Sequence, residues 1–358
     1  MSRTSSRTVS PPGCQTIVPP YILDAISRRG DDFERARALE TLLQTERFRG
    51  HRDATAGTCP VVPPGAERRT VYDEGGSSVL PGKLVLGEGG KPAKDPAVNE
   101  AYDGAGATYD FYEKVFCRNS IDGKGMRLDS SVHYGRGFDN AFWNGTQMVY
   151  GDGDGRIFNR FTVAVDVIGH ELTHGVTGTE ANFDYEWQPG ALNESFSDVF
   201  GSMVKQWKLG QTAVEADWLI GAGLFTPKVK GEGIRSMLHP GTAYDDPVLG
   251  KDPQPASMRD FYEGYDDNGG VHVNSGIPNR AFALAALALG GHSWEKAGPI
   301  WYRALTDRLG NTADFKETAA ATAAIAGELF GSVEEKAVHD AWRTVGVVVG
   351  AGAAAVVK

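Results

Sequence analysis

The 358-residue sequence predicts an α+β fold in which a strand-rich half precedes a helical half. Between Arg69 and about Gly155, short runs that alternate apolar and polar residues lie between Gly and Asp turns, which is typical of strands. Residues 140–153 have the pattern of a hairpin. From Phe161 onward, apolar residues recur at helical spacing. The domains we expect after the N-terminal segment are residues 66–185, which are strand-rich, residues 186–347, which are helical, and a tail at 348–358.

A small N-terminal module precedes both halves. A helical pattern runs from Leu23 to about Phe48, with strong helix formers at residues 36–40. Residues 49–66 are polar and contain Gly and Pro, which is typical of a linker. We therefore expect residues 1–58 to form a helical module and a tether.

Composition excludes some classes of protein. The net charge of −10 argues against a nucleic-acid partner, since nucleic-acid-binding proteins usually present a basic face. No run of 18 apolar residues occurs, so we expect no membrane partner. The N-terminus also lacks the apolar core of a signal peptide. Cys14, Cys59 and Cys117 are too few and too irregular for a disulfide framework, which leaves free thiols or a single Cys59–Cys117 pair as alternatives.

The segment His170-Glu171-Leu172-Thr173-His174 predicts a metal site. Residues four apart on a helix lie on one face, so both imidazoles can reach one ion. The neighbouring Glu171 can contact a metal-bound water. Zinc lowers the pKa of that water toward neutrality, so that a carboxylate can take its proton. The alternative is a non-catalytic helix that carries two surface histidines.

Two further residues argue against that alternative. Glu194 lies 20 residues after His174 on a second predicted helix, from which it can supply the third protein ligand that catalytic zinc needs. Asp198 lies one turn further on and can accept a hydrogen bond from the far nitrogen of a ligand imidazole. Together they predict a complete zinc site.

A second group of polar residues lies far downstream, around His272. Asp267 precedes it by five residues across a Gly269-Gly270 pair, which suggests a tight turn. We expect a helix to start just after it, with Asn274 or Ser275 as the cap. A lone histidine here could be structural. Beside a zinc site it could also donate to a developing oxyanion, with Asp267 orienting it.

Four blocks of the chain resemble the thermolysin family of neutral zinc metalloproteases. They are HELTHGVTG, GALNESFSD, NAFWNGTQMVYGDGDG and DNGGVHVNSGIPN, and the similarity covers roughly residues 68–346 in family order. The resemblance implies a two-domain α+β fold with the zinc helix between the halves and the cleft at their junction. It implies that one catalytic Zn²⁺ is bound by His170, His174 and Glu194 and that Glu171 polarises the attacking water. It also implies that Tyr185 and His272 stabilise the oxyanion. Asp267 would then support His272, and Asp198 would support a zinc histidine.

The resemblance also implies how substrate binds. Asn140, Ala141 and Trp143 match a strand edge that holds substrate backbone, and Arg235 matches an arginine that holds a substrate carbonyl. The specificity-pocket positions are all apolar: Phe158, Phe161, Val167, Ile220 and Ile234. We therefore expect protein and peptide substrates to be cut on the amino side of bulky hydrophobic residues. Because Phe161 is larger than the aliphatic residue usual in the family, the pocket is expected to be shallower.

The family's calcium chemistry matches less well. Asp166 matches a calcium ligand of larger members, but its partner position holds Lys205. Leu219 and Ala222 replace two acidic ligands near Asp217, and calcium takes six to eight oxygens. We expect the double-calcium site to be lost, with Ca²⁺ binding uncertain and a Lys205–Asp166 salt bridge in its place.

The opening Pro19-Pro20-Tyr21-Ile22-Leu23 resembles the protealysin-like subgroup, which has a short propeptide. That resemblance implies a zymogen whose own propeptide, residues 1 to roughly 50–60, inhibits it until removed. It implies secretion, with a cytoplasmic location as the alternative, and we expect a monomer. Cys14 could place a thiolate on zinc or be a bystander. The rival functions are an inactive binding protein, a zinc hydrolase of non-peptides, and an effector aimed at one protein.

Overall fold

The computed structural model describes residues 15–51 and 68–348. Cys14 and Cys59, residues 52–66 of the predicted tether and almost all of the predicted tail lie outside these ranges, so what the sequence indicates about them stays a prediction. Residues 49–51, which were assigned to the tether, are helical instead. Cys117 is exposed. None of the described helices is long and apolar enough to cross a lipid bilayer.

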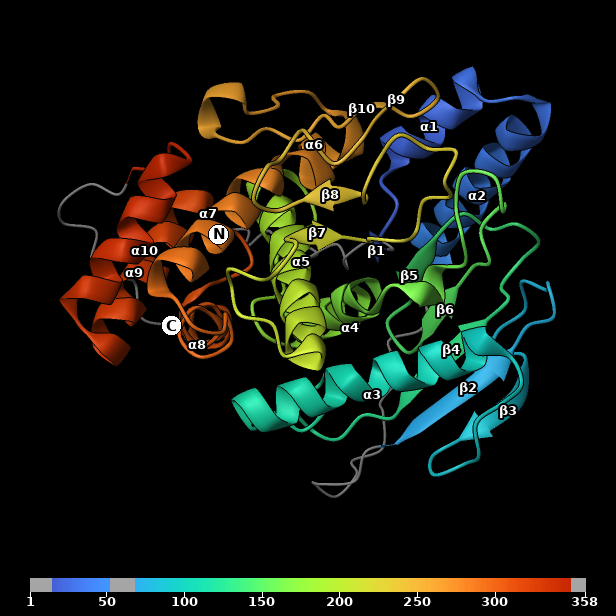
Figure 1. Cartoon of the computed structure of the whole chain (residues 1–358), viewed down its shortest axis with the longest axis horizontal. Helices are drawn as coiled ribbons and strands as arrows, with labels where there is room; N and C mark the ends of the chain where they lie inside the picture. The colour runs from blue at the N-terminus through green and yellow to red at the C-terminus, as the bar shows by residue number, and fades with distance from the viewer. Residues whose placement is uncertain (1–14, 52–67, 349–358) are drawn as a thin grey trace, which may run out of the picture.

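A mixed six-stranded sheet forms the strand-rich half, in the order β1-β5-β6-β4-β2-β3 (Figure 1). The pairs β2/β4 and β4/β6 are parallel, and the other neighbours are antiparallel. The expected hairpin is confirmed, since β5 pairs with β6. The strand bounds are β1 Gln15–Thr16, β2 Arg69–Asp73, β3 Lys83–Gly87, β4 Leu128–Val132, β5 Ala141–Trp143 and β6 Met148–Tyr150.

A long helix, α3 Pro96–Phe116, interrupts the region that the sequence pattern assigned wholly to strands and turns. That interpretation was wrong for these 21 residues. Asp95 caps the helix by accepting a hydrogen bond from the Ala97 amide, and Pro96 occupies the first turn. A Cβ at Gly104 would lie 2.3 Å from Ile168 Cδ1 on the neighbouring helix, so the two helices approach closely here. The glycines that let α3 approach its neighbour also hide its helical signal.

Two central helices, α4 Val165–Thr179 and α5 Trp187–Leu209, lie between the sheet and the C-terminal helices (Figure 1). They pack closely because glycines face each other where they cross. A Cβ at Gly201 would collide with the Asp166 carbonyl, and one at Gly169 would lie 3.1 Å from the Gly201 Cα. The close crossing brings residues from both helices to one point.

The helical half follows, and the predicted Ala-rich helices are present. A 3-10 turn, η2 Phe161–Val163, precedes α4. The remaining elements are the short strands β7 Leu219–Ile220, β8 Arg235–Ser236, β9 Asp245–Asp246 and β10 Gly250–Lys251, the 3-10 turn η3 Met258–Asp260, the π-helical turn η4 Ala304–Arg308, and the helices α6 Asp266–Asn274, α7 Gly276–Leu289, α8 Ala297–Arg303, α9 Phe315–Phe330 and α10 Ser332–Thr344.

The N-terminal module consists of two helices, α1 Pro20–Arg29 and α2 Asp32–His51, rather than one continuous pattern. The chain breaks at Gly30, where a Cβ would lie 2.8 Å from the Ile26 carbonyl. Asp31 then accepts hydrogen bonds from the Phe33 and Glu34 amides and starts α2. The module is docked on the body, because Ile17, Val18, Ile22, Leu23 and Ile26 are each 1% exposed or less within the main hydrophobic core.

His133 links the start of α3 to the segment after β6. Its Nδ1 lies 2.8 Å from Asp152 Oδ1 and its Nε2 lies 2.7 Å from Asp95 Oδ2. The hydrogen bond to Asp152 and the one to Asp95 outweigh partial burial and raise the pKa of His133 from 6.5 to about 9. The charged imidazole therefore joins two carboxylates.

We predict that His133→Gln lowers the free energy of unfolding by about 1 kcal/mol at acidic pH, because these ion pairs are partly exposed. A raised folded-state pKa means that this stabilisation is fully present below pH 6.5 and is lost as pH rises through about 9. Urea unfolding of both chains between pH 6 and 10 measures it, with His339→Gln on α10 as the control. A difference that grows with pH would contradict the assignment.

Candidate active site

The crossing of α4 and α5 brings three metal-binding side chains together. The Nε2 atoms of His170 and His174 are 3.0 Å apart. The Glu194 carboxylate lies 3.5 Å from His170 Nε2 and 3.6 Å from His174 Nε2. All three side chains are buried, and their ligand atoms lie within 4.8 Å of one another.

The hydrogen bonds of the two imidazoles test whether a cation fits between them. His170 Nδ1 lies 2.8 Å from Asp198 Oδ1, and His174 Nδ1 lies 2.9 Å from Asn193 Oδ1. Because both partners are acceptors, each Nδ1 carries the proton and each Nε2 presents a lone pair. Two lone pairs aimed at one point repel unless a cation lies between them. Tetrahedral zinc with nitrogen ligands has edges of about 3.4 Å, so the donor set and its spacing fit zinc.

Asp198 binds other side chains besides the His170 imidazole. Its carboxylate also accepts two hydrogen bonds from Arg235, at 2.8 and 2.7 Å, and one from Asn279 at 2.8 Å. Burial raises the pKa of Asp198, but Arg235 and His170 more than offset that effect, and the net pKa lies well below its usual value. The carboxylate is therefore ionised, and it fixes a ligand imidazole and a guanidinium at once.

Asn193 is a site residue that the sequence interpretation did not assign. Its amide oxygen is the partner of His174 Nδ1, and Ser197 Oγ lies 2.9 Å from the same nitrogen. The sequence indicates this role only through position, because Asn193 directly precedes Glu194 on α5 and Ser197 lies three residues after Glu194. Both residues orient the second imidazole as Asp198 orients the first.

Glu171 lies on the same helix between the histidines and the sheet edge. It is fully buried, and its Oε2 accepts a hydrogen bond of 3.0 Å from the Trp143 amide on β5. That contact joins α4 to the last residue of β5. The structure thus places Glu171 where a general base beside the metal ligands is expected.

His272 and Tyr185 approach the site from the opposite side. The imidazole Nδ1 of His272 lies 2.7 Å from Asp267 Oδ1, and its backbone amide donates to the other Asp267 oxygen at 2.9 Å. Burial lowers the pKa of His272, but Asp267 and Glu194 reverse this and raise it. The Tyr185 hydroxyl donates to Glu194 and lies 3.4 Å from His272 Nε2. Two hydrogen-bond donors thus converge beside the metal ligands.

The backbone before His272 makes a left-handed turn. Asp267, Asn268, Gly269 and Gly270 all have positive φ, between 53° and 81°. The predicted tight glycine turn is therefore present. The predicted helix start is also present, with Ser275 at the N-cap position of α7, but the Ser275 hydroxyl donates to the His272 carbonyl and caps no amide. His272 lies near the end of α6, and the chain passes directly into α7.

The N-terminal strand β1 runs antiparallel to β5 and forms one edge of the sheet beside it (Figure 1). The Ile17 amide donates to the Ala141 carbonyl at 3.2 Å. The Asn140 side chain accepts from the Val18 amide at 2.9 Å and donates to the Val18 carbonyl at 3.2 Å. The residues expected to hold substrate backbone thus hold the module's own backbone.

Two charged or polar side chains complete these main-chain contacts. Arg235 Nη1 donates to the Ile17 carbonyl at 3.1 Å, and His272 Nε2 lies 3.2 Å from the Thr16 carbonyl. Trp143 is the register partner of Gln15. The expected specificity-pocket residues have no exposed side-chain surface and belong to the same core cluster as Ile17: Phe158, Phe161, Val167, Ile220 and Ile234.

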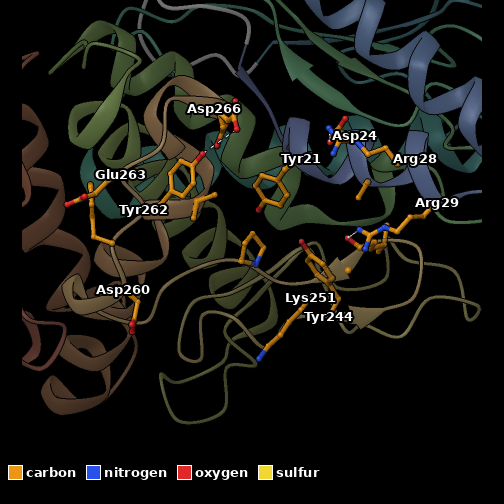
Figure 2. A pocket seen from close by; sticks show the side chains of 17 residues that line it. Tyr21, Asp24, Arg28, Arg29, Tyr244, Lys251, Asp260, Tyr262, Glu263 and Asp266 are labelled. Atoms are coloured by element: carbon orange, nitrogen blue, oxygen red, sulfur yellow. Dashed lines mark hydrogen bonds and ion pairs between the residues drawn. The ribbon is translucent and has the colours of Figure 1, made fainter.

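A cavity of about 920 Å³ lies where the module meets the helical half (Figure 2). Tyr21, Arg28 and Arg29 of α1 line one side, and Arg29 donates to the Leu249 carbonyl at 2.8 Å. Residues of the segment before His272 line the other side, including Asp267. The contact between α1 and the body is therefore incomplete on this side, although Ile22, Leu23 and Ile26 of α1 are buried.

Three family models match the chain in succession. The thermolysin metallopeptidase catalytic domain matches residues 71–178, the alpha-helical domain of thermolysin metallopeptidases matches 181–347, and the protealysin propeptide matches 15–47. The chain belongs to the thermolysin family of zinc-dependent metallopeptidases, and it is a metalloendopeptidase.

Within the family the chain is protealysin-like and carries an intramolecular propeptide. It is 53% identical over 335 residues to the extracellular metalloprotease of Pectobacterium carotovorum subsp. carotovorum, covering 93% of this chain and 96% of that one. It is 49% identical to protease PrtS of a Photorhabdus species, with 93% and 92% covered. The solved precursor of protealysin from Serratia proteamaculans superposes with a TM-score of 0.87 at 53% identity, covering 93% of this chain and all of that one.

We predict that Asn193→Ala weakens zinc binding by roughly 10-fold or more, because His174 loses the acceptor that fixes its tautomer and ring orientation. Competition with a chromogenic zinc chelator measures the dissociation constant. Asn159→Ala is the matched control, since that amide donates to the Gly223 and Phe225 carbonyls instead. An unchanged constant would remove Asn193 from the site.

Proposed function

We propose that this chain is the zymogen of a zinc endopeptidase that cleaves on the amino side of bulky hydrophobic residues. The observation that carries the proposal is that a peptide segment pairs in register with β5, where Glu171 contacts the Trp143 amide and His272 faces the Thr16 carbonyl. When bound by His170, His174 and Glu194, zinc supplies a water of lowered pKa.

The chain's own residues perform the remaining steps. Glu171 takes the proton of the attacking water and later delivers it to the leaving amine. His272 and Tyr185 donate hydrogen bonds to the carbonyl oxygen as negative charge develops on it. Asp267 holds His272 in the orientation that donates from Nε2. No residue needs to form a covalent bond with the substrate.

Peptide substrates are favoured over other zinc-hydrolase substrates by the main-chain contacts. The Asn140 side chain accepts from the Val18 amide and donates to the Val18 carbonyl. The Ala141 carbonyl accepts from the Ile17 amide, and Arg235 donates to the Ile17 carbonyl. These groups match the alternating N–H and C=O groups of an extended peptide. The apolar, fully buried pocket positions support a preference for Leu, Phe or Ile after the cleaved bond.

Inhibition by the propeptide follows from the same contacts. Residues 15–18 occupy the β5 edge and bind His272 and Arg235, so no substrate can use these groups while the module is docked. We further propose that the enzyme acts outside the cell as a monomer, with a cytoplasmic role as the alternative. Culture fractionation tests the location, and enzyme confined to the cell would overturn it. Light scattering tests the oligomeric state, and the molar mass of a dimer would overturn the monomer.

Loss of the Glu171 carboxylate tests the proposed mechanism. Wild-type chain should shorten to a start near residues 50–60 and digest casein, whereas Glu171→Ala should bind zinc, stay full length and lose at least 1,000-fold in activity, because it lacks the base. N-terminal sequencing over time measures both.

The new N-termini among the casein fragments should be enriched in Leu, Phe and Ile. Enrichment in Asp or Glu would contradict the proposed pocket. If zinc-loaded wild-type chain cut nothing even after residues 1–60 were removed, the endopeptidase proposal would fail.

The surroundings of Lys205 bear on the predicted loss of the calcium site. Lys205 Nζ lies 2.9 Å from Asp166 Oδ2, 2.8 Å from Asp217 Oδ1 and 2.6 Å from the Leu219 carbonyl. Burial lowers the pKa of Lys205, but Asp166 and Asp217 reverse this and raise it. We propose that this ammonium takes the place of the ion, so a calcium chelator too weak to strip zinc should leave the Tm unchanged.

The matching substitution is Lys205→Met. It leaves the Asp166 carboxylate buried without its partner and should lower the free energy of unfolding by about 3–5 kcal/mol. Lys208→Met, an exposed position on the same helix, is the control. A Tm that rises strongly on adding calcium to wild-type chain would refute the proposal.

A further inference from the structure

The propeptide strand lies in the cleft in the orientation of a substrate, and its hydrogen bonds identify one bond as the reacting one. Two carbonyls in succession are bound by two different side chains. The Thr16 carbonyl faces His272 Nε2 at 3.2 Å, and the Ile17 carbonyl receives a hydrogen bond from Arg235 at 3.1 Å. Under the proposed function, the carbonyl at His272 belongs to the cleaved bond and the carbonyl at Arg235 belongs to the residue after it.

Side-chain burial points to the same bond. Ile17 is a bulky aliphatic residue and its side chain has no exposed surface. A bulky aliphatic side chain directly after the cleaved bond is what the proposed preference requires. The amide of Ile17, which is the nitrogen of that bond, is already held by the Ala141 carbonyl.

We propose that the enzyme hydrolyses its own Thr16–Ile17 peptide bond while the propeptide stays docked, a cleavage distinct from the removal of the whole propeptide. This proposal rests on the proposed function. Water adds its oxygen to the Thr16 carbonyl carbon, the bond from that carbon to the Ile17 nitrogen breaks, and the proton taken by Glu171 passes to the leaving nitrogen. The products are a Thr16 carboxylate and an Ile17 ammonium group.

The two products differ in how firmly they are held. On the carboxyl side of the bond, Ile17 and Val18 keep their contacts with Ala141, Asn140 and Arg235, and the buried face of α1 stays in the core. On the amino side, the described contacts are those of the two-residue strand β1. We therefore expect the fragment that ends at Thr16 to leave, whereas the propeptide from Ile17 onward remains in the cleft.

Retention of that product explains how a cleavable segment can still inhibit. The Thr16 hydroxyl donates to the Val18 carbonyl at 3.2 Å, which stiffens the strand on both sides of the bond. A rigid segment that cannot leave after cleavage holds the active site closed, so the cut chain stays a zymogen until the tether is cut as well.

The test follows zinc-loaded full-length chain by intact mass and N-terminal sequencing at several protein concentrations. A species that begins at Ile17, with released residues 1–16, is expected at a rate independent of concentration. The matched variants are Ile17→Leu, which should keep this cut, and Ile17→Asp, which should slow it at least 100-fold. Casein digestion after maturation shows in each case that the catalytic part has folded.

The register in which β1 pairs with β5 is measured separately, in a chain that cannot cleave itself. In the Glu171→Ala chain, Ile17→Asp should speed amide hydrogen exchange at residues 141–143 at least tenfold, while Ile17→Leu leaves it unchanged. Equal exchange in the two variants would overturn the register.

The outcomes separate the two proposals. Chain that matures beyond residue 51 and digests casein without ever forming the Ile17 species would overturn this inference and leave the endopeptidase function standing. An Ile17 species whose rate rises with concentration would overturn cleavage by the chain's own site. Chain that cuts neither itself nor casein would overturn both.

Discussion

The buried carboxylate of Asp198 is the interaction on which the active site depends. It joins α4, β8 and α7 by accepting hydrogen bonds from His170, Arg235 and Asn279. A buried anion is stable only when its lone pairs are satisfied, and here three donors from three elements satisfy them. Metal binding and recognition of the peptide carbonyl are thereby coupled, because the group that orients the ligand also positions the guanidinium.

Close backbone packing makes that coupling possible. The crossing at Gly169 and Gly201 lets α4 and α5 approach until side chains from both reach one ion. On the opposite side, four successive residues in the left-handed region carry Asp267 over to the His272 ring. Strained backbone of this kind persists only where the surroundings hold it. Glycine supplies half of the turn and thus limits the strain.

The sequence predicted those parts of the molecule that depend on local spacing. The two histidines four residues apart require only one helix, and the hairpin at residues 140–153 requires only a turn between alternating runs. Glu194 was predictable because its helix is strongly periodic.

Other features depend on contacts between distant segments. The helix α3 was missed because Gly104, where it approaches Ile168 closely, weakens the local helical signal. Ser275 precedes α7 as the sequence predicts, but the contact of its hydroxyl with the His272 carbonyl depends on how the preceding turn folds. The role of Asn193 appears only once α5 lies against α4. No local rule places Thr16 beside His272, 256 residues away.

The tether explains why a substrate-like segment outcompetes real substrates. An attached strand has an effective concentration of the order of millimolar, whichever side chains it carries. The docked module adds buried Ile22, Leu23 and Ile26 to the backbone contacts of the strand. When the link between the module and the body is cut, the same contacts have to hold a separate chain. At micromolar concentrations of that chain, the ratio of occupied to free active sites falls about a thousandfold. Activation therefore requires no change in the active site itself, because cutting the tether converts a permanent inhibitor into a diluted competitor.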